Sequence, residues 1–394
     1  MRGISSRTRT GRRASELAAA LALSLGYASV ASAAQSFTMV QNHSGENFLS
    51  NWTFYSGVDL NTTGNVFFET QQQAQQEQLT FLNSDGNFIV KVDNTTDGTG
   101  NSTFGRPSVK MLSAYTITEG NLVLFDAVHM PFGCSGKQTT QIWPAFWSQG
   151  QNWPDDGEID IIEGVNQQAE NKISLHTLDG CTHPDNSSSS SIETGELVST
   201  DCFNQTNGNQ GCIVQVPGNS YGESFSSSGG GVYALNWNSS GLYMWFFPRG
   251  SIPSDLPTST PNPDGWGLPV AAYPKSSCNT DQFIKAQTLI LDITICGNFA
   301  GAADVFTTTG CSGVCTDLVA SPQNYDNAFF EISYIRVFSQ GGAAGGTVSG
   351  GGTSTTGADG SSSTSGSGGI YSLISGGSLL ALAILGLGMT FVAV

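Results

Sequence analysis

Three carboxylates stand in a six-residue segment, Glu-Ile-Asp-Ile-Ile-Glu from Glu158 to Glu163, whose other members suit a buried β-strand. Glu158 and Asp160 are two residues apart, so their side chains would point to the same face of a strand. Glu163 lies five residues after Glu158, and this odd spacing would place an unpaired carboxylate on the apolar face at high cost. One extra residue, accommodated as a β-bulge at Ile161 and Ile162, returns Glu163 to the carboxylate face. The segment therefore predicts a bulged strand with all three acids on one side.

Two carboxyl groups on one face suit the hydrolysis of a glycosidic bond. A retaining mechanism needs a nucleophilic and a proton-donating carboxyl group about 5–5.5 Å apart. With the bulge, Glu158 and Glu163 are separated by roughly 13 Å of strand backbone, which two glutamate side chains can close on a curved sheet. We expect their environments to keep Glu158 ionised and Glu163 protonated. The alternatives are a solvated acidic edge, which the alternating isoleucines disfavour, and a calcium site, whose Asp/Asn-rich loop spacing is missing.

Three tryptophans precede this segment, and each lies within fifteen residues of Glu158. Trp143 and Trp147 belong to the sequence Trp-Pro-Ala-Phe-Trp, and Trp153 is followed by another proline. The C–H faces of a pyranose pack on indole rings, so tryptophans beside carboxylates suggest a sugar-binding cleft. The alternative is core packing, which we expect for Phe146 and which stays open for Trp143. Trp147 and Trp153 are the stronger candidates for sugar contacts.

Short strand-like runs recur between residues 34 and 340, separated by glycine, asparagine and serine, and no segment keeps a helical period for three turns. This pattern predicts a single all-β domain over residues 34–340, built as an antiparallel β-sandwich or jelly roll. The clearest runs are 67–69, 88–92, 122–125, 231–237, 242–247, 289–293 and 330–338.

Both ends of the chain have the composition of processing signals. Residues 1–33 combine five arginines, an apolar run and an Ala-Ser-Ala cleavage pattern, which predicts a secretory signal peptide. Residues 341–369 are rich in Gly, Ser and Thr and predict a flexible stalk. Residues 370–394 end in an apolar tail that predicts a GPI-attachment signal; a membrane span is the alternative, although the tail is shorter than the ~20 residues a bilayer requires. We therefore expect a secreted protein anchored at the cell surface or cell wall.

The charge balance excludes some partners. The chain has 14 basic and 31 acidic residues, and five of the basic ones lie in residues 1–33. Without residues 1–33 the sequence contains no cluster of basic residues, so nucleic acids and anionic membrane surfaces are poor candidates for binding partners. Any membrane contact is expected through the lipid anchor alone. The eight cysteines and eight N-x-[ST] sequons fit the secretory pathway and predict disulfides, whose pairing stays open. No zinc-like His/Cys spacing is present, and we expect neither a metal nor a cofactor.

Residues 143–166 contain Trp-Pro-Ala-Phe-Trp, Trp-Pro-Asp-Asp-Gly and Glu-Ile-Asp-Ile-Ile-Glu-Gly-Val-Asn. This stretch resembles glycoside hydrolase family sixteen, in particular its laminarinase-like fungal endo-1,3(4)-β-glucanases, and the similarity extends over about residues 54–338. The resemblance implies a concanavalin A-like β-jelly roll with a concave glucan cleft. It also implies retaining endo-hydrolysis of β-1,3- or mixed β-1,3/1,4-glucan through a covalent glycosyl-enzyme. By position, Glu158 would be the nucleophile, Asp160 its assisting carboxylate and Glu163 the acid/base.

The same resemblance implies further site residues. His176, in Ser-Leu-His-Thr, would lie near Glu163, although such a histidine alone would equally suit a structural role. Family members often carry Gly-Asp-Trp-Ala-Gly where this chain has Gly-Asn-Phe-Ala-Gly, so the smaller ring of Phe299 is expected to weaken one sugar subsite. Asn236 stands where an acid is common, with no clear consequence. The residues expected to bind sugar are Arg106, Trp147 and Trp153, with Trp143, His176 and Phe299 as further candidates.

Two other functions compete with an endo-glucanase. A cell-wall transglycosylase would transfer glucan to sugar instead of water, but the transferase branches usually have the shorter motif without the bulge. A glucan-binding module on the same sandwich would need no acid/base pair, and such proteins tend to lose the glutamates that are present here. We expect a monomer with a β-glucan polysaccharide as its partner; the linkage preference stays open.

Overall fold

The strands form two large antiparallel sheets and one small sheet in the computed structural model. The structure describes residues 36–133, 142–185, 191–309, 311 and 313–341. The expected signal peptide, nearly all of the expected stalk and the apolar tail lie outside these residues. No helix among the described residues is long and apolar enough to cross a membrane.

The first large sheet holds strands from both ends of the domain. Its strand β1 (Phe37–His43) pairs with β19 (Phe329–Gln340), so that Phe37 lies opposite Gln340. Along the sheet the remaining order is β17 (Ala271–Pro274), β16 (Gly241–Pro248), β15 (Gly231–Asn238), β9 (Asn121–His129), β19, β6 (Phe88–Lys91) and β5 (Thr80–Leu82).

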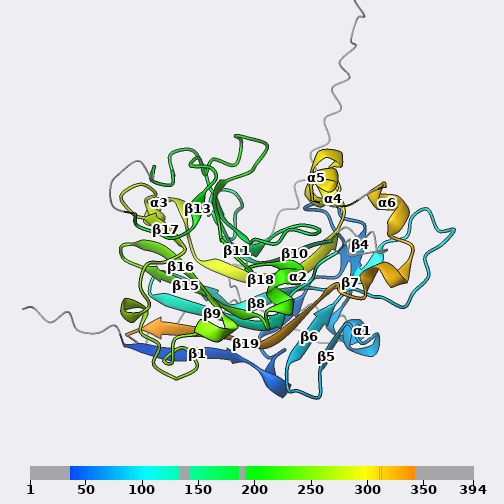
Figure 1. Ribbon diagram of the computed structural model, residues 1–394, viewed down its shortest axis with the longest axis horizontal. Coiled ribbons are helices and arrows are strands. Elements are labelled where there is room, and N and C mark those ends of the chain that lie inside the picture. The colour runs from blue at the N-terminus through cyan, green and yellow to red at the C-terminus, as the bar shows by residue number, and fades with distance from the viewer. Residues whose placement is uncertain (1–35, 134–141, 186–190, 310, 312, 342–394) are drawn as a thin grey trace, which may run out of the picture. The chain divides into compact units, whose positions relative to one another are not determined.

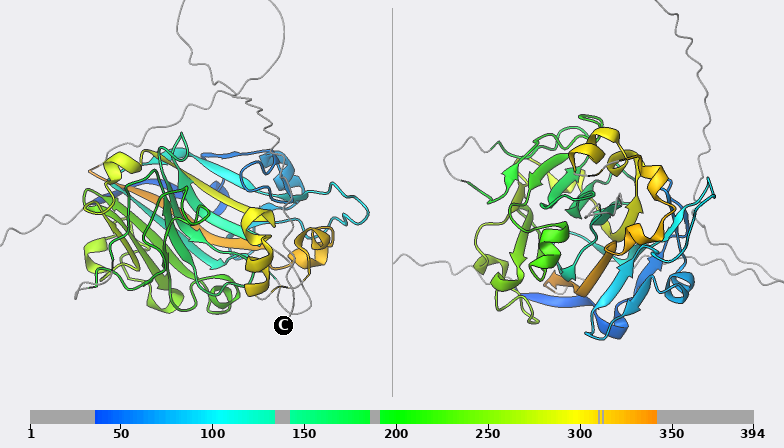
Figure 2. Two further views of the ribbon diagram at one scale, coloured as in Figure 1. Left: turned by 90° about the horizontal axis from the view of Figure 1, so that it is seen from above. Right: turned by 45° about the vertical axis from the view of Figure 1, so that its right-hand side comes forward.

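The second large sheet stacks on the first, and Figures 1 and 2 show the two as curved layers. A small third sheet contains β3 (Gly57–Val58), β4 (Val66–Phe68) and β7 (Arg106–Ser108), of which β4 and β7 run parallel. The order in the second sheet is β13 (Glu196–Leu197), β14 (Cys212–Gln215), β12 (Lys172–His176), β11 (Glu158–Glu163), β10 (Ile142–Gln149), β18 (Gln287–Ile295), β8 (Lys110–Ile117) and β2 (Trp52–Phe54).

The helices are short and lie in the connections. The longest described α-helices have six residues, in agreement with the missing helical periodicity of the sequence. The α-helices are α1 (Gln71–Gln76), α2 (Gly222–Ser227), α3 (Thr280–Phe283), α4 (Gly297–Ala300), α5 (Ala303–Thr308) and α6 (Cys315–Leu318), and the 3-10 helices are η1 (Gly45–Asn47), η2 (Arg249–Ser251), η3 (Pro263–Gly265) and η4 (Pro322–Tyr325).

The two large sheets differ in how many faces they bury. In β9, Val123 and Phe125 belong to the core between the sheets, whereas Leu122 and Leu124 belong to a second apolar cluster on the opposite face. The first sheet is therefore covered on both sides. In the second sheet, apolar residues alternate with polar ones, because only one of its faces packs against the core. The expected antiparallel β-sandwich is confirmed, and its free face is the one on the second sheet.

Three disulfides join described residues in the connections. They link Cys181 to Cys278, Cys202 to Cys212 and Cys296 to Cys315. The first pair joins two loops, the second joins a loop to β14 and the third joins the segment after β18 to α6. Each cross-link limits the conformations available to the unfolded chain. The expectation of disulfides is thus met, with pairings that the sequence left open.

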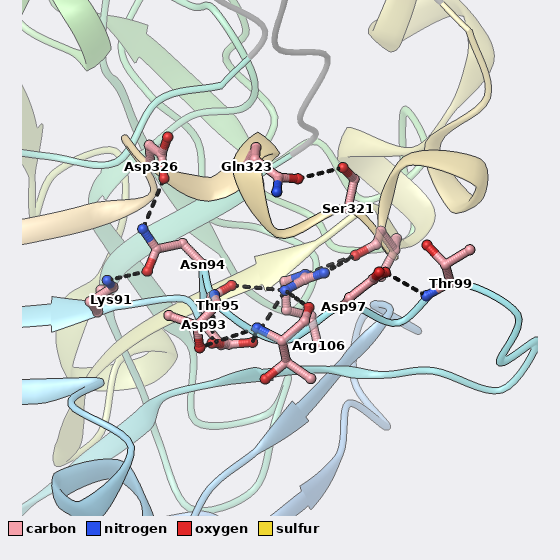
Figure 3. A network of polar contacts seen from close by, with 12 residues as sticks. Lys91, Asp93, Asn94, Thr95, Asp97, Thr99, Arg106, Ser321, Gln323 and Asp326 are labelled. Carbon is pink, nitrogen blue, oxygen red and sulfur yellow. Dashed lines mark hydrogen bonds and ion pairs between the residues drawn. The ribbon is translucent and has the colours of Figure 1, made fainter.

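Arg106 corrects one of the site expectations. Its side chain is fully buried and does not line the cleft described below. The guanidinium donates to the carbonyl oxygen of Val319 at 2.6 and 2.8 Å and pairs with Asp93 at 3.2 Å (Figure 3). It also lies over the rings of Phe104 and Tyr325. Arg106 therefore joins the segment after β6 to the segment after α6, and it is not a sugar ligand.

Replacing Arg106 should cost stability and leave sugar binding unchanged. Arg106→Met leaves the Asp93 carboxylate buried without its cation, so we expect the free energy of unfolding to fall by about 3 kcal/mol. Urea unfolding measures this change. The matched control is Lys275→Met, which removes the partly exposed partner of Asp281 and should change the stability little. An Arg106→Met chain with unchanged stability and a raised KM for glucan would restore the sugar-binding role.

Candidate active site

The β-bulge expected in the acidic segment is present in β11. Ile162 lies opposite Phe146 of β10, and Asp160 lies opposite Trp147. The register shifts between these two pairs, and Ile161 is the extra residue. The parity of the strand therefore changes at the position that the sequence indicated.

The bulge brings the three carboxylates to one face. Glu158, Asp160 and Glu163 all line a cleft of about 910 Å³ on the free face of the second sheet. The three isoleucines of β11 are buried in the core on the other side. Glu158 and Glu163 lie opposite residues of β10 that are four positions apart, Gln149 and Ala145, which corresponds to roughly 13 Å of strand at the usual rise.

Strand β10 forms the floor of the cleft beside β11. Trp143, Ala145 and Trp147 line the cleft, because side chains two apart on a strand share a face. Phe146 points the other way and is fully buried in the core, as expected. Trp143, which the sequence left open between core and cleft, is therefore a cleft residue, and the proline that follows it does not disturb the alternation.

Each glutamate accepts a hydrogen bond from an indole. Trp143 Nε1 donates to Glu163 Oε1 at 2.8 Å, and Trp153 Nε1 donates to Glu158 Oε2. The Trp153 side chain is 43% exposed, so its ring offers an open apolar surface at the rim of the cleft. These tryptophans orient the two carboxyl groups and leave ring surface available to a ligand.

His176 lies opposite Glu158, and its charge also acts on Glu163, near which it was expected. The register of β12 against β11 places it opposite Glu158. Its Nε2 is 3.2 Å from Asp160 Oδ2, and Ser174 Oγ donates to the same oxygen at 2.5 Å. One oxygen of Asp160, Oδ2, is thus held by two residues of β12.

Burial and mutual repulsion raise the pKa values of both glutamates. For Glu158 and Glu163 alike, burial is the larger cause and the charge of Asp160 adds to it. Burial alone would lower the pKa of His176, but the charge of Glu158 and the hydrogen bond to Asp160 outweigh it and raise that pKa to about 10. The cluster therefore retains protons at pH values where isolated glutamates are ionised. The sequence predicted an ionised Glu158 and a protonated Glu163, but burial raises the pKa of Glu158, to about 8, at least as far as that of Glu163, to about 7, so burial does not separate the two roles.

Further cleft residues come from strands distant in the sequence. Asp292 of β18 accepts from Trp147 Nε1 at 3.1 Å and pairs with Lys110 of β8 at 3.2 Å. The expected cleft residue Phe299 is present and packs edge-on against Trp143, with ring centroids 5.2 Å apart. Sequence reasoning missed Lys110 and Asp292, although a charged residue within the apolar run Leu-Ile-Leu-Asp-Ile was a usable signal.

Among the described residues, one group of three side chains places possible metal ligands close together. It consists of Glu158, Asp160 and His176, whose atoms lie within 4.8 Å of one another. A metal requires a neutral imidazole, but the pKa of His176 is raised to about 10 and its Nε2 already faces Asp160. The arrangement suits a protonated histidine between carboxylates better than a metal, and we assign it no metal.

An antiparallel sandwich with two glutamates between tryptophans in an open cleft defines a protein of the glycoside hydrolase type. The family model for the XgeA-like catalytic domain of glycoside hydrolase family 16 matches residues 52–338, and the chain belongs to that family. It is 40% identical over 326 residues to a probable endo-1,3(4)-β-glucanase of Aspergillus niger, covering 80% of this chain and 42% of that protein.

Two solved structures share the fold closely. Laminarinase 16A from Phanerochaete chrysosporium, bound to β-glucans, is 36% identical with a TM-score of 0.70, covering 77% of this chain and 99% of that one. An elongating family 16 β-1,3-glucosyltransferase is 34% identical, also with a TM-score of 0.70, covering 77% of this chain and all of that one. Both the hydrolase and the transferase therefore use a closely similar sandwich.

Removing one carboxylate from the cluster should stabilise the fold at neutral pH. A raised carboxyl pKa means that the folded chain binds more protons than the unfolded chain as pH rises above 4.5, so stability falls over that range. Glu163→Gln removes this loss, and we expect its unfolding free energy to exceed that of the wild type by on the order of 2 kcal/mol at pH 8 and by little at pH 4. Unfolding curves at the two pH values measure the difference.

The control for that experiment is Glu196→Gln. Glu196 is an exposed carboxylate on β13 of the same sheet, so its replacement should give no gain that grows with pH. A Glu163→Gln chain that is less stable than the wild type at pH 8 would contradict the account of the cluster.

Proposed function

We propose that this chain is a retaining endo-glycosidase that hydrolyses β-1,3- or mixed β-1,3/1,4-glucan. The observation that carries the proposal is the bulged strand β11, which presents Glu158 and Glu163 on one cleft face, each hydrogen-bonded to a tryptophan. Two carboxyl groups in such a cleft are what a double-displacement mechanism requires. The names of the relatives support β-glucan as the substrate class.

In this mechanism Glu163 acts first as the acid. Burial raises the pKa of Glu163, so its carboxyl group can hold a proton near neutral pH. It gives this proton to the glycosidic oxygen as the glycosidic bond breaks. The Glu158 carboxylate attacks the anomeric carbon and forms a covalent glycosyl-enzyme. Glu163, now ionised, takes a proton from water, and the hydroxide oxygen replaces Glu158 at the anomeric carbon. Both carboxyl groups return to their starting protonation states.

Glu158 must be ionised when it attacks. Burial and the charge of Asp160 raise the pKa of Glu158, while the positive charge of His176 and the hydrogen bond from Trp153 act in the opposite direction and favour its ionised form. Asp160 lies between the two glutamates and is held by Ser174 and His176. We assign Asp160 the role of the assisting carboxylate, because its negative charge keeps the neighbouring His176 protonated.

The cleft walls suit a neutral sugar polymer. Trp143, Trp147 and Trp153 offer indole faces on which pyranose rings can pack. Product analysis on laminarin, lichenan and chitin, with and without an acceptor oligosaccharide, tests the substrate class and the reaction together. Short β-glucan products with a retained anomeric configuration are expected. Elongated products would favour the transferase alternative, and binding without any product would favour a glucan-binding module.

We also propose that the chain is secreted and held at the cell surface or wall by a C-terminal lipid anchor. The arginine-rich, apolar start, the Gly/Ser/Thr-rich segment and the apolar tail support this proposal. The disulfides among the described residues are of the kind that form in oxidising compartments.

Each glutamate should be indispensable for turnover. Glu158→Gln and Glu163→Gln remove the nucleophile and the acid, and we expect kcat on laminarin to fall by roughly 10³-fold or more in each case, with folding intact. Reducing-sugar release measures kcat, and circular dichroism checks folding. Glu196→Gln is the matched control. If either active-site variant is folded and keeps near-wild-type turnover, the assignment of roles is wrong.

Truncation tests the localisation proposal. The last strand, β19, ends at Gln340, so a chain that stops there retains both sheets. Expressed in a fungal host, it should be secreted into the medium with the same activity per molecule as the full chain, which should remain with the cell fraction until a phospholipase that cleaves GPI anchors releases it. Cell association of the truncated chain, or failure of the phospholipase to release the full one, would contradict the anchor.

A further inference from the structure

A short loop closed by a disulfide contacts the histidine of the active site. Cys202 and Cys212 are bonded, and Cys212 is the first residue of β14. Residues 207–210, from the loop between these cysteines, line the cleft. Cys212 also pairs in register with Leu175, the neighbour of His176. The end of the loop is therefore fixed next to β12, the strand that carries His176, and the middle residues of the loop lie at the cleft.

The backbone of this loop is held in a conformation that few residues favour. Asn207, Gly208, Asn209 and Gly211 have φ angles of 49°, 69°, 64° and 70°, in the left-handed region that glycine and asparagine tolerate best. The amide of Asn209 donates to the carbonyl oxygen of Thr206 at 2.9 Å, which closes the turn. Such a run is retained where the surrounding structure holds it in place.

The turn directs the Asn209 side chain at His176. Asn209 Oδ1 is 3.1 Å from His176 Nδ1, on the far side of the ring from the contact between Nε2 and Asp160. Gly211 completes the enclosure: a Cβ added there would lie 2.5 Å from the carbonyl oxygen of Leu175 and 3.0 Å from His176 Cε1 and Nε2. The imidazole is thus held at both nitrogens and along one face.

We propose that Asn209 is a positioning residue for the reaction: by accepting a hydrogen bond from His176 Nδ1, it holds the imidazole so that Nε2 faces Asp160 beside the proposed nucleophile. The inference rests on the proposed function of the same cleft. An amide oxygen accepts this bond without adding charge, which leaves Nδ1 protonated and Nε2 free to donate to Asp160. The raised pKa of His176 agrees with protons on both nitrogens.

The alternative is that Asn209 serves only as a wall of the cleft that binds sugar. The two roles differ in the kinetic constant they affect. A positioning residue acts on the transition state through His176 and Asp160, so its loss lowers kcat, whereas the loss of a sugar contact made equally in the ground state raises KM.

Three variants separate these roles. Asn209→Gly removes the acceptor and keeps a residue that tolerates the left-handed backbone. Asn209→Asp keeps an oxygen acceptor in a residue that also tolerates it. Gln205→Ala is the control, since Gln205 is an exposed residue of the same loop that does not line the cleft.

The expected result is a fall in kcat of about tenfold or more for Asn209→Gly on laminarin, with KM changed by less than about threefold. Asn209→Asp should recover most of the lost kcat, and Gln205→Ala should match the wild type. A kcat for Asn209→Gly within twofold of the wild type, an effect confined to KM, or no recovery by Asn209→Asp would each overturn the proposal.

Crystal structures of the wild type and of Asn209→Gly give a readout that does not depend on turnover. We expect His176 Nε2 to face Asp160 in the wild type and the ring to be turned or spread over several orientations in the variant. An unchanged ring in Asn209→Gly would overturn the proposal even if activity fell. A wild type that hydrolyses no β-glucan would overturn the proposed function, while the two crystal structures would still decide whether Asn209 holds the ring.

Discussion

The site depends on the parity of one strand. Successive side chains of a regular β-strand point to opposite faces. In a segment of six residues, the first and the last therefore lie on opposite faces. Both can be acids on the same face only if one residue between them forms a bulge. Ile161 is that residue in β11. Without the bulge, Glu163 would enter the core between the sheets, where an unpaired carboxylate costs several kcal/mol. The bulge is therefore at once a requirement of folding and the source of the paired carboxylates.

The asymmetry between the two sheets makes this strand usable. The first sheet is covered on both faces by apolar clusters and supplies a rigid support. The second sheet has one free face, and there neighbouring strands place charged and aromatic side chains beside the acids, among them Trp147, Asp292 and His176. Because these groups sit on hydrogen-bonded strands, their separations are set by sheet geometry. Glu158 and Glu163 are thus kept close to Asp160 and partly removed from water, which raises the pKa values of both glutamates.

Much of this was predictable from local sequence pattern. Strand alternation located the core and cleft faces of β10 and β11, and the odd spacing of Glu158 and Glu163 indicated the bulge. The prediction that went wrong concerned a contact between distant segments. Arg106 has the chemistry of a sugar ligand, but its destination depends on Val319, more than two hundred residues later. Only the sheet register could show that His176 lies opposite Glu158.

The two strands that begin and end the described domain are neighbours, since Phe37 of β1 lies opposite Gln340 of β19. The chain thus enters and leaves the sandwich at a single place, on the sheet that does not carry the cleft. Residues 37 and 340 could therefore be joined by a short peptide, and new ends opened in an exposed turn, with little disturbance to either sheet. For the same reason, a segment fused to either end of residues 37–340 would start from the same edge of the first sheet.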